Sequence, residues 1–360
     1  MNIRHNILLI ILDIICAAAM VGAIWIIGYK LPQNGVEAQV SSGMTTGADS
    51  SEVTVGESTS TSVSSGSQSG SLVTTDVKLD TTDWGTKFAD KFTDTVVTTA
   101  DSYTSPDISI HLTRNSYDSG IIDTSENGKH KKYGSKISYV LADIYIADIR
   151  CFQTAFADNT YGVGYSQKLS DMADSIGAVL AVNGDSYSNN RNKNNGTIIR
   201  NGVIYRAKSA DYETCVLNWD GTMQIYQPGT IDEQTLIQNG AYQSWVFGPS
   251  LLNEDGSAKT DFITNSYIQE SHPRTAIGYY EPGHYCLLLV DGRQQASRGM
   301  FLTEMSQLFE SLGCKAAYNL DGGHCSFMYF NGSIANNPYK PEHQVSDGIF
   351  LTELAAAGKA

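Results

Sequence analysis

Hydrophobic residues in this chain gather into short runs, several of which end at a glycine turn that carries an acidic residue. Three such runs, each with its acid, are residues 178–182 with Asp185, residues 287–290 with Asp291, and residues 316–318 with Asp321. Apolar runs of this length that are closed by glycine predict buried strands. Because glycine allows a tight turn, we expect the three acids to lie together on one rim of a sheet.

Helical spacing of apolar residues precedes two of these strands. The pattern over residues 169–176, with Ser170 as the expected N-cap, ends at Gly177, and the pattern over residues 302–312 ends at Gly313. Glycine is the preferred residue just after a helix C-terminus. We therefore predict two helices, each leading directly into a strand.

The two strands that follow these helices end in the same Asn-x-Asp pattern, at Asn183 and Asp185 and again at Asn319 and Asp321. Residues two apart on an extended chain share a face, so each pair lies side by side. A single acid of this kind often only caps a turn. Three acids with arginines nearby favour an active site instead, because carboxylates are costly to bury without a use.

These elements predict a mixed α/β (α+β) fold, with a mixed β-sheet core flanked by helices. We expect a single globular domain over residues 105–355, after an N-terminal transmembrane helix.

The N-terminal residues 7–29 form a nearly unbroken apolar run of the length that spans a bilayer as a helix. Asp13 interrupts it, at a cost of about 3 kcal/mol at mid-membrane and less toward an end. Residues 1–30 therefore predict a cytoplasmic tip and a single-pass anchor in the cell membrane, with the N-terminus inside and the following domain extracellular. A cleaved signal peptide is the alternative, although the run continues past the small residues 17–19.

Residues 31–76 are dominated by Ser, Thr and Gly. Such a segment buries too little apolar surface to offset its ordering entropy, so we predict a disordered stalk. Residues 77–104 carry Trp84, Phe88 and Phe92 at four-residue spacing, which predicts a short helical lead-in to the domain.

The formal net charge of −14 makes nucleic acid an unexpected partner, because phosphate-backbone binding depends on clustered Lys and Arg. The histidines lack a tight metal-ligand spacing, so zinc is not expected. Of the six cysteines, Cys16 lies in the apolar run and an odd five remain. Cys325, beside the glycine turn, is a candidate nucleophile for which the sequence nominates no base.

Several short motifs follow one another in a fixed order. They occupy residues 181–187, 199–203, 247–249, 272–278, 290–293 and 319–323, with Gly299 and Glu304 between the last two. In this order they resemble the phosphodiester glycosidase domain family, whose bacterial members are often described as exopolysaccharide biosynthesis proteins. The resemblance covers about residues 105–355. The chain departs from the usual pattern at His324, where many relatives carry small residues, and at His343, where an arginine commonly precedes the valine.

The resemblance implies a hydrolase that cleaves the glycosidic bond of a sugar 1-phosphodiester in envelope or extracellular glycan. Arginine suits the phosphate, and Arg274 and Arg293 are the candidates, although Arg293 could instead pair with Asp291. Asp291 and Asp321 are the candidate carboxylates that stabilise or trap an oxocarbenium-like state. A phosphodiester is already a weakly basic leaving group, so a general acid is largely dispensable.

Further residues near these motifs are expected to bind the glycan phosphodiester. Sugar hydroxyls would be bound by Asn183, Asp185 and Asn319, or these three side chains would orient the acids. A phosphate oxygen would accept hydrogen bonds from Thr275 and from the backbone N–H groups of Gly322 and Gly323. The sugar pocket would be lined by His324.

Metal binding is the main alternative role for the acids. Hydrolysis at the sugar carbon requires no cofactor, but Asp185, Asp291 and Asp321 with His324 could form an oxygen-rich Ca²⁺ or Mg²⁺ site. A metal-assisted phosphodiesterase that cuts the P–O bond is therefore an open alternative. So is a non-catalytic protein that binds glycan or assists exopolysaccharide assembly.

Overall fold

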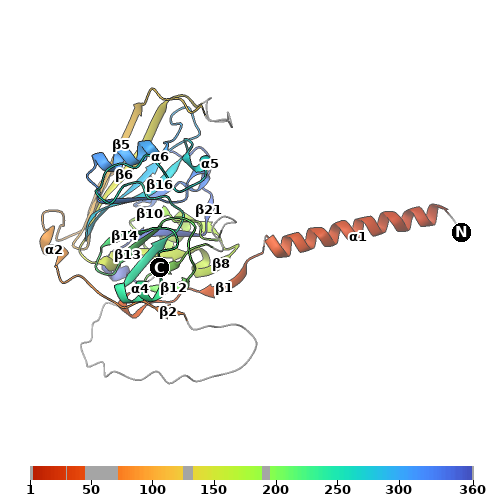
Figure 1. Cartoon of the computed structure of the whole chain (residues 1–360), viewed down its shortest axis with the longest axis horizontal. Coiled ribbons are helices and arrows are strands. Elements are labelled where there is room, and N and C mark those ends of the chain that lie inside the picture. Colours follow the sequence, from red (N-terminus) through yellow and green to blue (C-terminus); the bar gives the residue numbers. More distant parts are fainter. Residues whose placement is uncertain (1–2, 30, 45–71, 125–132, 189–194, 359–360) are drawn as a thin grey trace, which may run out of the picture.

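The computed structural model describes residues 3–29, 31–44, 72–124, 133–188 and 195–358. Helix α1 (Ile3–Tyr29) extends away from the body that the other described residues form (Figure 1). It covers the apolar run for which a membrane anchor is predicted. Within the described residues no helix is long and apolar enough to cross a membrane, so the structure does not support the predicted transmembrane helix.

Two antiparallel sheets form the centre of the body. The larger sheet has the strand order β18 (Ala316–Asn319), β16 (Arg274–Glu281), β17 (His284–Val290), β6 (Lys136–Ile146), β5 (Ile108–Asp118), β4 (Ser102–Thr104) and β3 (Val97–Thr98). The smaller sheet has the order β20 (Ser333–Ile334), β19 (Met328–Phe330), β10 (Leu180–Asn183), β22 (Asp347–Leu351) and β7 (Phe152–Phe156). Every strand pair that the described residues form is antiparallel, so the predicted mixing of strand directions is wrong.

After His284, strand β17 carries only hydrophobic residues, and both its faces are buried there. Its odd-numbered residues from Tyr285 to Leu289 face a central core, and its even-numbered residues from Cys286 to Val290 pack with helix α6 (Leu302–Ser311). This alternation follows from the period of two along a strand.

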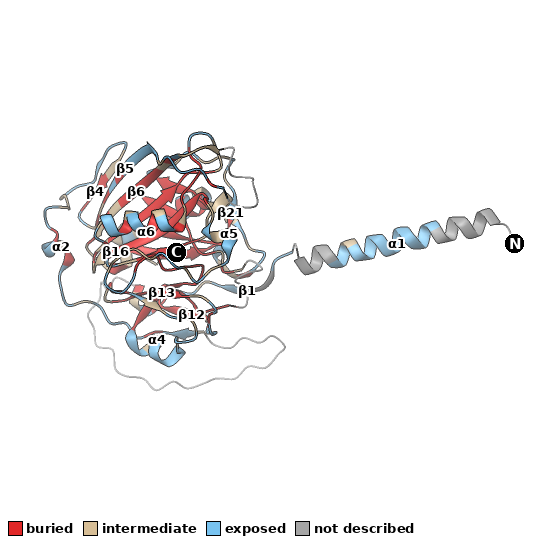
Figure 2. Cartoon of the chain, turned by 45° about the horizontal axis from the view of Figure 1, so that its top comes forward, coloured by how far each residue is buried: buried red, intermediate tan, exposed pale blue. Residues whose placement is uncertain are grey.

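Strand β10 shows the same arrangement in the smaller sheet. Leu180 and Val182 join the central core, whereas Ala181 packs with helix α3 (Leu169–Ile176). The body is therefore layered in the order α6, seven-stranded sheet, five-stranded sheet, α3, and its buried residues concentrate on the strands (Figure 2).

Smaller elements surround these layers within the described residues. The remaining sheets are β11 (Ile198–Arg200) with β12 (Val203–Arg206) and β2 (Val73–Thr74), β14 (Met223–Tyr226) with β13 (Thr214–Asn218) and β15 (Ala241–Trp245), β1 (Gln33–Glu37) with β8 (Thr160–Val163), and β21 (Gln344–Val345) with β9 (Gln167–Lys168). The short helices are α2 (Trp84–Lys87), α4 (Glu233–Asn239) and α5 (Ser266–Gln269). The chain thus forms one mixed α+β domain with many strands and few helices, as predicted.

The two predicted helices are confirmed, with one correction at a cap. Gly177 follows α3 in the left-handed conformation, as expected for a glycine at this position. Ser170 is not the N-cap, because α3 begins at Leu169. Its backbone N–H and its hydroxyl donate to the carboxylate of Glu342, at 2.8 and 2.6 Å. The carboxylate of Glu342, a residue distant in sequence, therefore accepts a backbone hydrogen bond from the first turn of α3.

The predicted stalk, residues 31–76, is wrong at both ends. Strand β1 pairs with β8, and Met44 is 1% exposed in the central core, where the Tyr242 hydroxyl donates to its Sδ at 3.2 Å. Strand β2 pairs with β12, and the Thr75 hydroxyl donates to the Ala241 carbonyl at 2.6 Å. Residues 45–71, which carry most of the Ser, Thr and Gly, lie outside the described residues.

The helical lead-in is shorter than predicted. Helix α2 has four residues, and Trp84 and Phe88 are buried in the central core. The lead-in is therefore part of the folded domain.

Candidate active site

A pocket of about 210 Å³ lies where strand ends from the two central sheets meet. It is lined by Phe247, Tyr267, Ile268, His272, Pro273, Arg274, Arg293, Asp321, Gly322, Gly323 and His324. The Asn183 side-chain amide, at the end of β10, donates to the Asp321 carbonyl at 2.7 Å, and the Asp321 N–H donates to the Gly184 carbonyl at 3.1 Å. The predicted rim is therefore built from two sheets rather than one.

Arg274 starts β16 and lies at the floor of the pocket, 2% exposed. Its guanidinium donates to the carbonyls of Met300, Ile268 and Glu270, at 3.0, 2.7 and 2.5 Å. Burial and the neighbouring Arg293 both lower the pKa of this guanidinium. Arg274 thus orders the loop around α5 and also adds positive charge beside the pocket.

Arg293 follows β17 and lines the same pocket, half-buried. Its guanidinium donates to the hydroxyls of Tyr339 and Tyr267, at 2.9 and 3.2 Å, and approaches His272 Nδ1 at 3.3 Å. Neither Arg274 nor Arg293 forms an ion pair with a carboxylate in the described part of the chain. The alternative of an Arg293–Asp291 pair is therefore wrong, and the two adjacent cations favour an anionic ligand.

Asp321 follows β18 and faces the arginine pocket. Its carboxylate accepts from the Ser186 hydroxyl and from the Gly322 N–H at 2.9 Å, and the Cys325 thiol lies close to it. Burial raises the pKa of Asp321, and these donors partly offset that rise because they favour the ionised form. Burial and the nearby Asp321 raise the pKa of the Cys325 thiol, which disfavours Cys325 as a nucleophile.

Asp291 does not line this pocket. It is 4% exposed at the end of β17, and it accepts from Asn336 Nδ2 at 3.0 Å and from the Asn337 N–H at 3.1 Å. It lines a narrow neighbouring cavity that also touches Gly323 and His324. Burial raises the pKa of Asp291 to about 6. The predicted carboxylate pair is thus divided between two cavities.

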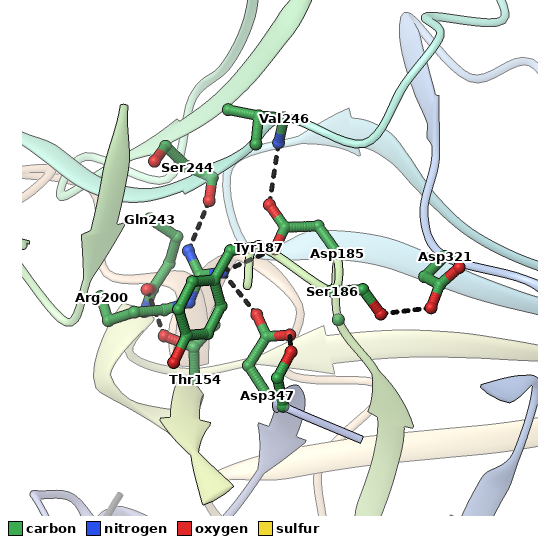
Figure 3. Close-up of polar contacts among 12 residues, drawn as sticks. Thr154, Asp185, Ser186, Tyr187, Arg200, Gln243, Ser244, Val246, Asp321 and Asp347 are labelled. Atoms are coloured by element: carbon green, nitrogen blue, oxygen red, sulfur yellow. Dashed lines mark hydrogen bonds and ion pairs between the residues drawn. The ribbon is translucent and has the colours of Figure 1, made fainter. Parts of the chain in front are cut away.

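Asp185 belongs to a buried ion-pair network beneath the site (Figure 3). Its carboxylate accepts from Arg200 Nη2 at 3.2 Å and from the Val246 N–H at 2.9 Å, and Arg200 also pairs with Asp347. Burial and the like charge of Asp347 raise the pKa of Asp185 to about 7. Because Asp185 is fully buried, the structure opposes its predicted contact with sugar.

The predicted polar contacts from Asn183, Thr275 and Asn319 are also directed inward. The Thr275 hydroxyl donates to Asn183 Oδ1 at 2.7 Å, so its proton is not available to a phosphate oxygen. Asn319 Nδ2 donates to the Gly248 carbonyl at 2.8 Å. All three side chains are buried, and Asn183 fits the alternative role of orienting the acid-bearing turn.

The glycine turn lines the pocket but does not form the predicted anion nest. The Gly322 N–H donates to Asp321 Oδ1, and the Gly323 N–H donates to the Pro273 carbonyl at 2.9 Å. A Cβ on Gly322 would lie 2.7 Å from that carbonyl oxygen. Glycine is therefore needed for the close approach of two backbones, and both N–H groups are already used.

His324 lines both the arginine pocket and the Asp291 cavity. Its Nε2 lies 3.0 Å from the Pro341 carbonyl, so this nitrogen carries the proton, and its ring stacks on His343. The two positions at which the chain departs from the usual family pattern are thus in contact.

Several residues of the site escaped the sequence interpretation. Tyr267 and Phe247 line the pocket, and Ser186 and Tyr339 bind its charged groups. Ser186 and Phe247 lie inside motifs that carry the family resemblance, which was the one signal available for them. Tyr267 lies in the four-residue helix α5 and has no pattern around it.

The donor set offers little support for a metal site. Within the described residues, no group of three or more His, Cys, Asp and Glu side chains is arranged to hold a metal ion. Asp185 is paired with Arg200, Asp291 lies in the neighbouring cavity, and only Asp321 faces the pocket. The predicted set of three acids is therefore not brought together.

Comparisons with known proteins bear on this site. A Bacillus subtilis protein, the SPbeta prophage-derived uncharacterized protein YomE, is 33% identical over 193 residues, which is 52% of this chain and 29% of that protein. The N-acetylglucosamine-1-phosphodiester alpha-N-acetylglucosaminidase of Bos taurus is 32% identical over 108 residues, or 29% of this chain and 19% of that enzyme. The chain thus spans less than a third of the length of these relatives.

A solved structure gives a weaker match. The catalytic domain of the zebrafish N-acetylglucosamine-1-phosphodiester alpha-N-acetylglucosaminidase, auto-inhibited by its pro-peptide, aligns with a TM-score of 0.49 at 20% identity, over 69% of this chain and 89% of that one. Residues 176–352 match the family model of the phosphodiester glycosidases, and this range contains every residue that lines the arginine pocket. The family resemblance that the order of motifs predicts is therefore confirmed over residues 176–352, which match the phosphodiester glycosidase family.

Proposed function

We propose that this domain hydrolyses the glycosidic bond of a sugar 1-phosphodiester. One observation carries the proposal: Arg274 and Arg293, without a carboxylate partner in the described residues, share a small pocket with the carboxylate of Asp321. Arg293 would bind the phosphate through its planar fork, and Arg274 would add charge from the floor of the pocket. Asp321 would act at the anomeric carbon.

The chemistry of the substrate fits these residues. Cleavage at the anomeric carbon develops positive charge on the sugar, which a carboxylate stabilises or traps. The leaving phosphodiester is anionic and weakly basic, so arginines rather than a general acid would stabilise its departure. The name of the bovine relative supports N-acetylglucosamine as the first sugar to test.

The location and the physiological substrate belong to the same proposal. We propose that the domain acts outside the cell, at the membrane, on envelope or extracellular glycan, as the sequence predicts. Protease added to intact cells would then degrade the domain, and protection until lysis would contradict an extracellular location.

Glycan binding without turnover is the second candidate function. It is favoured by the fact that Asp321 is the single carboxylate among the described residues that line the pocket. Glycosidases generally use two carboxyl groups on either side of the scissile bond. A phosphate leaving group reduces the need for the second one, which is why hydrolysis remains our first choice.

A substrate panel separates the two functions. The full chain is incubated with sugar 1-phosphodiesters, N-acetylglucosamine among them, and the released sugar is measured beside an Asp321→Asn control. We expect turnover by the wild-type protein and retained binding with little turnover by the variant. Saturable binding of a phosphodiester without turnover by the wild type would favour the binding function.

A further inference from the structure

Two site residues hold an unusual backbone conformation. Six non-glycine residues of the described chain have positive φ, and four of them are Asn or Asp, which tolerate this region. The other two are Ser186, with φ 49°, and Arg293, with φ 56°. Strained residues of this kind persist where the surroundings impose them, and they cluster at functional sites.

The neighbours of Ser186 fix its backbone from both sides. Asp185 is held by Arg200 and by the Val246 N–H in the buried network (Figure 3). On the other side, Tyr187 is 1% exposed and its hydroxyl donates to the Gly162 carbonyl at 3.2 Å. Ser186 itself is half-buried. The left-handed turn is therefore set by residues that do not contact the pocket.

This turn directs the Ser186 hydroxyl toward Asp321. The hydroxyl donates to Asp321 Oδ2 (Figure 3). The Gly322 N–H donates to Oδ1, so each carboxylate oxygen has a donor of its own. Two donors on different oxygens fix the plane of the carboxylate. They also favour its ionised form.

We propose that Ser186 is a positioning residue for Asp321, and that the buried Asp185–Arg200–Asp347 network imposes the backbone conformation that aims its hydroxyl. The proposal rests on the proposed function in one respect, since it takes Asp321 as the group that acts on substrate. The hydroxyl presents the carboxylate to the pocket in one orientation and favours its ionised form over the neutral one.

Ser186→Gly and Ser186→Ala test this role. Both variants remove the hydroxyl, and the glycine variant also relieves the strain at positive φ. We expect the pKa of Asp321 to rise in both, because a donor to the ionised form is lost. We also expect Ser186→Gly to have a higher Tm than Ser186→Ala. Asn331→Gly, at an exposed turn with φ 47°, is the matched control and should leave the pKa of Asp321 unchanged.

The pKa is measured on the full chain by ¹³C NMR of labelled Asp carboxyls, and the Asp321 signal is assigned by its loss in Asp321→Asn. An Asp321 pKa that stays unchanged in the folded Ser186 variants would overturn the proposal. Because this titration needs no substrate, its result is independent of whether the wild-type protein turns over the phosphodiester panel. For an active wild type, we expect kcat to fall at least tenfold in both variants and KM to change less than twofold.

Discussion

The imidazole rings of His324 and His343 stack in parallel, with their centroids 4.5 Å apart and 12° between their planes. His324 forms part of the pocket wall, and His343 covers its ring from the exposed side. His343 is exposed, but packing on the His324 ring partly desolvates its imidazole, and this desolvation, followed by the proximity of His324, lowers the pKa of His343. Protonation of both stacked rings at the same time is therefore disfavoured at the edge of the site.

Removal of the covering ring should affect binding more than folding. We expect His343→Ala to raise KM severalfold, because His324 loses the ring that holds it in the pocket wall. His343→Phe keeps an aromatic partner and should stay close to wild type. Because His343 is exposed, both variants should remain within about 0.5 kcal/mol of the wild-type stability. Steady-state kinetics and thermal unfolding measure these effects, and equal KM values for all three proteins would count against the role.

The two arginines should differ when each is replaced by alanine. Arg293→Ala removes a charge-assisted contact to phosphate worth about 3 kcal/mol, so we expect kcat/KM to fall at least a hundredfold with the fold intact. Arg274→Ala leaves the buried Met300 carbonyl without its donor, at about 1–3 kcal/mol, and also removes the donor from the partly buried carbonyls of Ile268 and Glu270, so it should lower stability as well. A folded Arg293→Ala protein with unchanged kinetics would remove Arg293 from the phosphate site.

Asp291 should influence stability in a pH-dependent manner. Its pKa is raised to about 6 in the folded state from an ordinary value of 3.8, so the stability that the neutral carboxyl contributes is present below pH 4 and is lost as the pH rises through 6. Asp291→Asn avoids this ionisation. We compare the free energy of unfolding of Asp291→Asn with that of wild type at each pH. We expect this difference to favour the variant more at pH 7 than at pH 4, by on the order of 2–3 kcal/mol.

Denaturant unfolding of the wild-type and Asp291→Asn proteins across pH 4 to 7 measures this difference. Turnover provides the control, because Asp291 lies outside the arginine pocket: Asp291→Asn should lose far less activity than Asp321→Asn. A stability difference independent of pH would show that the Asp291 carboxyl titrates normally.

The segment before the Ser/Thr/Gly stretch should be required for stability. Met44→Ala creates a cavity in the central core, and we expect a loss of about 2–5 kcal/mol. Leu31→Ala, at a residue that is 51% exposed in the same segment, should have little effect. Thermal unfolding compares the two. A Met44→Ala protein as stable as wild type would show that residues 31–44 are dispensable for the fold.

The sequence predicts well the elements whose signals are local. The apolar runs before Asn183 and Asn319 form strands, and the helices before them end at the expected glycines. The layering and the antiparallel pairing could not be predicted, because they depend on which distant strands meet. The stalk prediction failed because the average composition of residues 31–76 concealed the contribution of Met44 to the core.

For the site, motif order identified Arg274, Arg293 and Asp321, which do line one pocket. Motif order could not show that Asp185 forms a buried ion pair with Arg200, because that network also requires Asp347, which is distant in sequence. The role of Ser186 depends on the same long-range network. Side-chain direction, rather than residue type, separates the residues that face the pocket from those that support it.

The position of bond cleavage tests the central claim most directly. Wild-type protein hydrolyses a sugar 1-phosphodiester in ¹⁸O-labelled water, and mass spectrometry locates the label, with Asp321→Asn as the inactive control. If Asp321 acts at the anomeric carbon, the heavy oxygen appears on the released sugar and the phosphate product is unlabelled. Label on the phosphate would mean P–O cleavage, and it would contradict the proposed glycosidase mechanism in favour of a phosphodiesterase.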